Sequence, residues 1–334
     1  MKIGGIEKTT LIDYPGEIAT IIFTQGCNFR CQFCYNPMLV WPESEDSKLK
    51  YNPLNNGVDQ RDHSEITEND LFAFLKGRKG RVDGVVITGG EPTLHPDLPE
   101  FIEKIKTIGY KVKLDTNGTN PEMLTRIVGA PLAGAQEVII SSERAVASPA
   151  PTDEKSTSVG ASLAGANEFD LTLSSNRAVA SPAPTDEKST SVGASLAGAH
   201  FFPSRGVNQE GKVEQECLID YIAMDIKAPL EKYEQITQVK VNTGNIKKSI
   251  NLIMNSGLPY EFRTTIPPEL LNQEDVKKMG ELIRGADKWY LQFFKSDTNL
   301  VNRDLENHQA YTTKQMAELV DIAKQYVKFC EARG

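Results

Sequence analysis

Short runs of β-branched and other apolar residues alternate along the chain with segments whose apolar residues recur at helical spacing. The runs predict buried strands at residues 18–23, 84–88, 110–114, 221–226, 260–266 and 289–294. Helical spacing predicts helices at residues 67–75, 98–108, 121–128, 246–255, 273–283 and 314–330. Because strands that alternate with helices pack into parallel sheets, the pattern favours an α/β fold. Six such units suit an open, partial barrel with its functional loops at the carboxyl ends of the strands.

The alternation stops between about residues 130 and 216. Within this stretch, segment 144–166 recurs letter for letter at 177–199. The repeat is rich in Ala, Ser, Thr, Gly and Pro and contains no aromatic residue, so it cannot bury enough apolar surface to offset its ordering entropy. We expect a disordered low-complexity insertion, either a neutral linker or a partner-docking arm, that divides the core into residues 1–129 and 217–334.

Composition narrows the class of protein. The 334 residues are 39% hydrophobic, and the formal net charge is -8 with a pI near 5.3. No apolar run approaches the roughly 20 residues of a membrane span, and the first residues lack the apolar stretch of a signal peptide. A soluble cytoplasmic protein is expected, with no membrane partner and, given the acidic balance, no nucleic-acid partner.

Three cysteines, Cys27, Cys31 and Cys34, follow the first predicted strand with the spacing C-x3-C-x2-C. Three thiolates on one loop can hold three irons of a 4Fe-4S cluster and leave the fourth iron open, whereas an electron-transfer cluster has four protein ligands. Cys217 and Cys330 stand apart and are expected to be ordinary buried residues. Structural zinc with a histidine as fourth ligand is an alternative for the three cysteines.

Polar residues and glycines also follow the next strands, where parallel α/β folds build their sites. These candidates are Gly89, Gly90, Glu91, Asp115, Thr116, Asn117, Asp225, Lys227 and Arg263.

Each of these residue types has a physical role that suits a ligand. The paired glycines would let a ligand approach the backbone closely, and Glu91 beside them would bind an ammonium group. Asp115 and Asp225 offer carboxylates for hydroxyls or a cation, and Lys227 and Arg263 offer positive charge for a carboxylate. The set suits a zwitterionic amino acid attached to a ribose.

On these motifs the sequence resembles the radical S-adenosylmethionine (SAM) superfamily, with Phe33 as the aromatic residue of the cysteine motif. More narrowly, it resembles the activating proteins of anaerobic ribonucleoside-triphosphate reductase, through segments 8–37, 83–102, 112–122, 218–234 and 260–271. The resemblance covers about residues 1–128 and 217–297. It implies a partial (βα)6 TIM-like barrel interrupted by the insertion.

The resemblance also implies a reaction. SAM would chelate the open iron, and one electron from a flavodoxin- or ferredoxin-type donor would cleave its sulfonium bond. The resulting 5′-deoxyadenosyl radical would take a hydrogen atom from a glycine of a glycyl-radical enzyme, here expected to be anaerobic ribonucleotide reductase.

The superfamily pattern implies roles for particular residues. The three cysteines match the cluster ligands, and Gly89, Gly90 and Glu91 match the motif that holds the SAM amino group. Asp115-Thr116 and Asp225-x-Lys227 resemble positions near the SAM carboxylate, where a monovalent cation can bind. Tyr35 departs from the pattern, because relatives commonly carry His after the last cysteine.

Two rival functions remain open from the sequence. One is a radical SAM enzyme acting on a small molecule, such as an enzyme of deazapurine biosynthesis. The other is a non-enzymatic iron-sulfur or zinc module, for which Glu91 would be dispensable.

Overall fold

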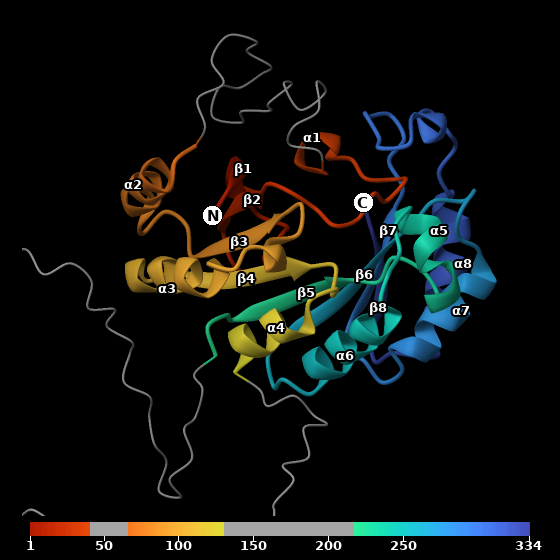
Figure 1. Ribbon diagram of the computed structural model, residues 1–334. Coiled ribbons are helices and arrows are strands. Elements are labelled where there is room, and N and C mark those ends of the chain that lie inside the picture. Colours follow the sequence, from red (N-terminus) through yellow and green to blue (C-terminus); the bar gives the residue numbers. More distant parts are fainter. Residues whose placement is uncertain (41–65, 130–216) are drawn as a thin grey trace, which may run out of the picture. The chain divides into compact units, whose positions relative to one another are not determined.

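The structure is a computed structural model, and it describes residues 1–40, 66–129 and 217–334. The predicted insertion at 130–216 lies outside these residues, so the division of the chain around it stays a prediction. The described residues belong to one compact unit, which is built on a single sheet (Figure 1).

The sheet has eight strands whose order in space follows their order in the chain. β1 pairs antiparallel with β2, and every later pair is parallel, which confirms the predicted α/β fold with a mostly parallel sheet. The strands are β1 (Ile3–Thr10), β2 (Ala19–Thr24), β3 (Gly84–Gly89), β4 (Lys111–Thr116), β5 (Tyr221–Asp225), β6 (Tyr260–Ile266), β7 (Trp289–Phe293) and β8 (Cys330–Arg333).

Six of these strands match the predicted ones, and the two edge strands were not predicted. β1 contains two adjacent glycines followed by the charged pair Glu7-Lys8, so its sequence carries little strand signal. The predicted helix 314–330 was wrong at its end, because the helix stops at Ala323 and Cys330 starts β8. Ala323, Val327 and Cys330 keep helical spacing, but Cys330 pairs with Trp289 of β7.

The helices start where their capping residues allow. The Thr67 side chain accepts a hydrogen bond from the main-chain N–H of Asp70, as predicted. The side chain of Asn120, the residue before Pro121, accepts one from the main-chain N–H of Met123. The helices are α1 (Pro37–Val40), α2 (Glu68–Arg78), α3 (Leu98–Ile108), α4 (Pro121–Val128), α5 (Tyr233–Thr237), α6 (Thr243–Met254), α7 (Gln273–Leu282) and α8 (Thr313–Ala323). α1 and α5 are too short for their spacing to be recognised in the sequence.

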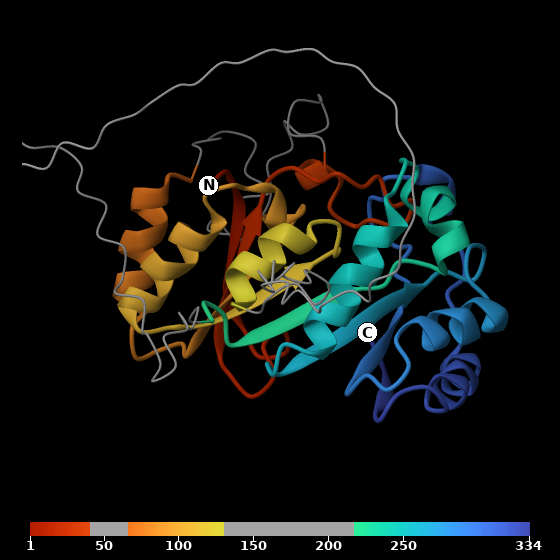
Figure 2. The same ribbon diagram turned by 60° about the horizontal axis from the view of Figure 1, so that its bottom comes forward.

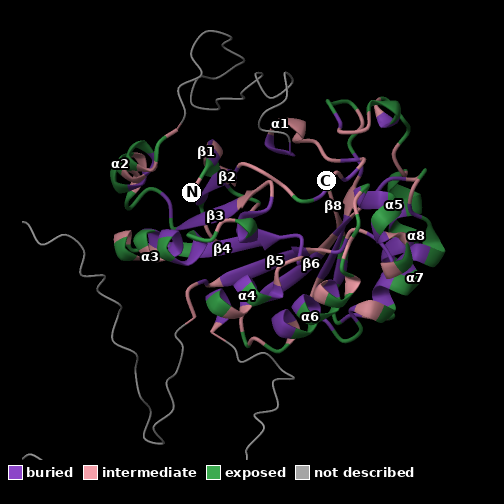
Figure 3. Cartoon of the chain, viewed as in Figure 1, coloured by how far each residue is buried: buried purple, intermediate pink, exposed green. Residues whose placement is uncertain are grey.

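The two faces of the sheet differ in chemistry because side chains alternate along each strand. α4 and α6 lie side by side along β4 to β6 (Figure 2), and the strands beneath the helices are largely buried (Figure 3). On β4, Val112 and Leu114 join the apolar core, whereas Lys113 and Asp115 alternate with them and point to the other face. That face therefore carries the buried charges of Lys113 and Asp115.

No helix in the part of the chain that the structure describes is both long and apolar enough to span a membrane.

Candidate active site

A pocket of about 280 Å³ lies over the polar face of the sheet, at the carboxyl ends of the parallel strands. All twelve candidate residues named from the sequence line it: Cys27, Cys31, Cys34, Gly89, Gly90, Glu91, Asp115, Thr116, Asn117, Asp225, Lys227 and Arg263. The residues come from five strands and the loops that follow them, so the topology of the sheet brings them together. Their individual roles stay predictions.

Main-chain hydrogen bonds hold the cysteine loop on two sides. On one side, Arg30 and Gln32 donate to the carbonyl oxygens of Thr237 and Ile236, at 2.9 and 3.2 Å. On the other, Val301 and Asn302 donate to the carbonyl oxygens of Cys34 and Gln32, at 3.2 and 3.0 Å. The loop is therefore fixed by segments that follow β5 and β7, and all three cysteines face the pocket.

The three thiols share one electrostatic environment. Burial, helped by the neighbouring cysteines, raises the pKa of Cys27 to about 11 and that of Cys31 to about 12. Lys227 acts in the opposite direction on both. Thiols that face one pocket, beside a half-buried ammonium group that favours thiolates, suit a 4Fe-4S cluster with three protein ligands. Among the described residues, no three His, Cys, Asp or Glu side chains are arranged to hold a single metal ion.

The paired glycines allow two stretches of backbone to touch. Gly90 donates its N–H to the Thr24 carbonyl at 2.9 Å, and Glu91 donates to the Gly26 carbonyl at 2.8 Å. A Cβ on Gly90 would lie 1.9 Å from that Gly26 oxygen, and Gly89 adopts a φ of 119°. The glycines therefore fasten the end of β3 to the start of the cysteine loop, in addition to lining the pocket.

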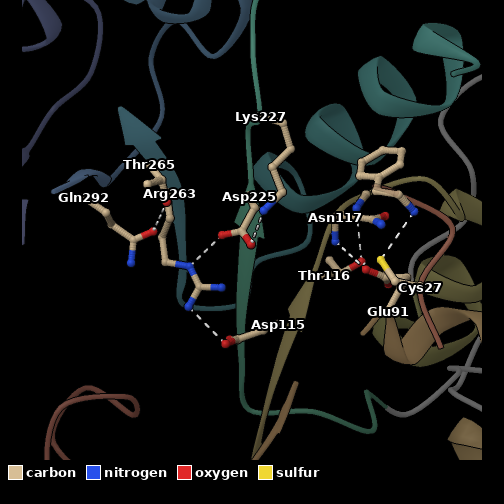
Figure 4. A network of polar contacts seen from close by, with 12 residues as sticks. Cys27, Glu91, Asp115, Thr116, Asn117, Asp225, Lys227, Arg263, Thr265 and Gln292 are labelled. Atoms are coloured by element: carbon tan, nitrogen blue, oxygen red, sulfur yellow. Dashed lines mark hydrogen bonds and ion pairs between the residues drawn. The ribbon is translucent and has the colours of Figure 1, made fainter. Parts of the chain in front are cut away.

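Glu91 is buried at the junction of three segments, with an exposed fraction of 1%. Its Oε1 accepts from the hydroxyls of Thr93 and Thr116 at 2.5 and 2.7 Å and from the Thr93 main chain at 3.2 Å. Its Oε2 accepts the main-chain N–H of Asn117 at 2.6 Å (Figure 4). Burial raises the pKa of this carboxyl, although the hydrogen bonds oppose the shift. A carboxylate oxygen can accept two donors, so Oε2 could take one more from a ligand.

Five charged side chains form an alternating chain across the polar face. Lys113 bonds Asp115 at 2.6 Å, Arg263 bonds both Asp115 at 3.0 Å and Asp225 at 2.9 Å, and Lys227 bonds Asp225 at 3.0 Å (Figure 4). Burial alone raises the pKa of both carboxyls, but Arg263 and the lysines outweigh it and hold each pKa below its usual range. Both carboxyls therefore stay ionised at neutral pH.

Several residues of the pocket and its support were missed by the sequence interpretation. Lys113 carries no signal in a strand, yet it is fully buried against Asp115. Asn28 links the cysteine loop to the segment after β4, because its amide accepts from Asn117 and donates to Thr119, both at 2.8 Å. Thr265 and Gln292 line the pocket from β6 and β7. The alternation of polar and apolar residues along β6 and β7 could have indicated Thr265 and Gln292.

Tyr35, the position that departs from the superfamily pattern, also lines the pocket. Its hydroxyl donates to the main-chain oxygen of Phe293 at 3.5 Å, a long hydrogen bond. The side chain thus connects the cysteine loop to the end of β7.

Comparisons with known proteins agree with this geometry. A provisionally assigned glycyl-radical enzyme activating enzyme of Methanocaldococcus jannaschii is 22% identical over 330 residues, covering 97% of this chain and 92% of that protein. A pyruvate formate-lyase-activating enzyme of Staphylococcus aureus is 32% identical over 117 residues, 34% of this chain and 39% of that enzyme. The 7-carboxy-7-deazaguanine synthase of Halobacterium salinarum is 29% identical over 104 residues, 31% of this chain and 33% of that enzyme.

The family model described as the radical SAM superfamily matches residues 21–135. That span includes the three cysteines, the Gly89-Gly90-Glu91 motif and the polar end of β4. With these residues gathered on one pocket of a mostly parallel α/β sheet, the chain contains a radical SAM domain.

Proposed function

We propose that this protein activates a glycyl-radical enzyme, using a 4Fe-4S cluster and SAM, and that its partner is anaerobic ribonucleoside-triphosphate reductase. The observation that carries the proposal is the convergence of the three cysteines with the Glu91 and Asp225–Arg263 groups on one pocket. The similarity to a provisionally assigned activating enzyme, which extends over 97% of the chain, supports it.

When both groups are bound, the cluster and SAM supply a 5′-deoxyadenosyl radical that can abstract a hydrogen atom. The protein's own residues have distinct tasks in this proposal. Cys27, Cys31 and Cys34 hold the cluster, and the backbone clamps on their loop keep its orientation fixed. The free acceptor capacity of Glu91 Oε2 suits the ammonium group of SAM.

The charged chain would orient the rest of the cofactor. Lys227 is half-buried near the cysteines, so its ammonium group suits the SAM carboxylate. Asp115 and Asp225 would face hydroxyl groups. The monovalent cation implied by the resemblance stays a prediction, and Arg263 already places positive charge between the two carboxylates. The flavodoxin- or ferredoxin-type electron donor also stays a prediction.

The test is anaerobic electron paramagnetic resonance. The protein is reconstituted with iron and sulfide, reduced, and mixed with SAM and an anaerobic ribonucleoside-triphosphate reductase. The proposal predicts the doublet signal of a glycyl radical on the reductase, in an amount that depends on SAM. If the reductase shows no such signal and a different glycyl-radical enzyme acquires it, the assignment of the reductase as partner is wrong.

A small-molecule function is the second candidate, because the chain is 29% identical to a 7-carboxy-7-deazaguanine synthase over 104 residues. It predicts SAM consumption that depends on a small heterocycle and is unaffected by any glycyl-radical enzyme.

A further inference from the structure

One wall of the pocket carries an uncharged polar pair. Thr265 of β6 and Gln292 of β7 are partners in the sheet register, and both side chains line the pocket. Figure 4 shows them together on one side of Arg263, whereas Cys27 and Glu91 lie on the other side of the charged chain. The charged chain therefore separates the polar pair from Cys27 and Glu91, whereas Tyr35, which follows Cys34, lies beside Thr265.

The polar pair is only weakly bonded to itself. Thr265 Oγ1 lies 3.5 Å from Gln292 Oε1, at the limit of a hydrogen bond. Exchanging the contact with Gln292 for a bond to a ligand would cost little; Thr265 also hydrogen-bonds the Tyr35 side chain. The pair is half-buried, so a ligand that covered it would remove both groups from water and would have to satisfy them.

The surroundings of the pair favour a neutral ligand. The nearby charged residues Asp225 and Arg263 are already engaged in ion pairs with one another and with their neighbours. Elsewhere on the pocket wall, Ile21 and Phe23 of β2 and Val86 of β3 offer only apolar contact, and Asp13 is bonded by the Thr10 hydroxyl. A charged side chain of a substrate would find no free partner among these residues.

The chemistry of the pair matches a peptide main chain. A carboxamide donates and accepts at once, and a hydroxyl can do either, so Gln292 and Thr265 can satisfy one peptide N–H and one C=O. We propose that Thr265 and Gln292 form the subsite that binds the main chain of a peptide segment of the partner and so help to present its glycine within the pocket that the cysteines line. This inference rests on the proposed function and adds the residues that select its substrate.

Binding of a short peptide tests the subsite. The full-length protein, with its cluster reconstituted and SAM present, is titrated under anaerobic conditions with a capped peptide whose central residue is dideuterated glycine. Thr265→Val and Gln292→Leu remove hydrogen-bonding groups at nearly constant size, and each should raise the Kd of the peptide about fivefold. Gln273→Leu, the same change at an exposed position, serves as the matched control and should leave the Kd unaltered.

Two more variants separate recognition from folding. Thr265→Ser keeps the hydroxyl and should bind the peptide like the wild type. Gln292→Glu keeps the size of the side chain but loses the hydrogen-bond donor and adds a charge, so it should bind the peptide weakly. The Kd of SAM, measured on the same samples, should change less than twofold in all of them. The KM of the peptide, measured from deuterium transfer into 5′-deoxyadenosine, should rise in the same variants and in the same order as the Kd of the peptide.

The outcomes distinguish this inference from the function on which it rests. Equal loss of SAM and peptide binding, or an unchanged peptide Kd in both Thr265→Val and Gln292→Leu, would overturn the subsite. A wild-type protein that forms the glycyl radical on its partner but binds no peptide would also overturn it, and would leave the proposed function standing. Binding of guanosine that depends on Gln292 and excludes the peptide would replace the main-chain ligand by a heterocycle.

Discussion

The carboxylate of Glu91 accepts the main-chain N–H of Asn117 at 2.6 Å, which joins the segment after β3 to the segment after β4. Glu91→Gln should therefore destabilise the protein, because the new amide nitrogen cannot accept this N–H while the amide oxygen takes the three donors on the other side. We expect a loss of about 1–3 kcal/mol in the free energy of unfolding. Urea denaturation of the variant beside Glu318→Gln, an exposed control, measures it. Equal stability of the two variants would show that the carboxylate is not holding these segments.

Gly90→Ala should damage the fold, because the new Cβ would lie 1.9 Å from the main-chain oxygen of Gly26 and neither backbone can move freely. A loss of about 3 kcal/mol or more is expected, as for other severe overpacking in a core. Gly77→Ala is the control, since nothing lies within 4 Å of its Cβ and the residue sits inside α2. That variant should gain about 0.5–1 kcal/mol. Thermal denaturation that ranks the two in the opposite order would refute the contact.

Arg263→Met tests the charged chain on the polar face of the sheet. Removing the guanidinium leaves each carboxylate with one lysine, so we expect a loss of about 3 kcal/mol, near the low end for breaking a buried ion pair. Arg284→Met removes an exposed pair with Glu281 and should cost less than about 1 kcal/mol.

The effect of Arg263→Met should depend on pH. In the wild type, the pKa values of Asp115 and Asp225 are held below the usual range, so their stabilising contribution is complete above about pH 4 and is lost as the pH falls through the lowered values. Without Arg263 both pKa values rise. The stability difference between the variant and the wild type should then be largest at pH 7 and shrink toward pH 4.5. A difference that is constant across this range would contradict the ionised state of the two carboxyls.

Asn28→Ala should loosen the cysteine loop without unfolding the protein. The variant loses two hydrogen bonds to Asn117 and Thr119, both in the segment after β4. Each is worth about 1 kcal/mol, and a loss of about 2 kcal/mol for the two corresponds to about thirtyfold. After anaerobic reconstitution, the visible absorbance of the variant in the presence of a chelator should decay up to about thirtyfold faster than that of the wild type. Unchanged decay would mean that the clamps at residues 30–34 hold the loop alone.

The sequence predicted the six central strands and most long helices because their apolar periodicity is strong and their caps are local. α3 and α4 begin and end where predicted, each ending at a glycine with positive φ. The edge strands β1 and β8 depend on pairing with distant partners, which no local pattern records. The end of α8 was mistaken for the same reason, since only the pairing of Cys330 with Trp289 decides it.

The candidate site was predictable where chemistry-bearing residues follow strands in the chain. The cysteines, Glu91 and Asp225 stand at such positions, and a parallel sheet brings them to one edge. Lys113 could not be predicted, because a lysine within a strand is ordinarily exposed and its burial depends on Asp115 and on the inward face of β4. The role of Glu91 in holding the segments after β3 and β4 required the hydrogen bonds themselves.

The central claim is that the three cysteines support radical SAM chemistry. The direct measurement is formation of 5′-deoxyadenosine from SAM by the reconstituted, reduced protein under anaerobic conditions. Cys31→Ala removes a pocket thiol, and Cys217→Ala removes a cysteine outside the pocket. The account predicts product from the wild type and Cys217→Ala and none from Cys31→Ala. A loaded, reducible cluster that forms no product, or product that survives Cys31→Ala, would contradict it.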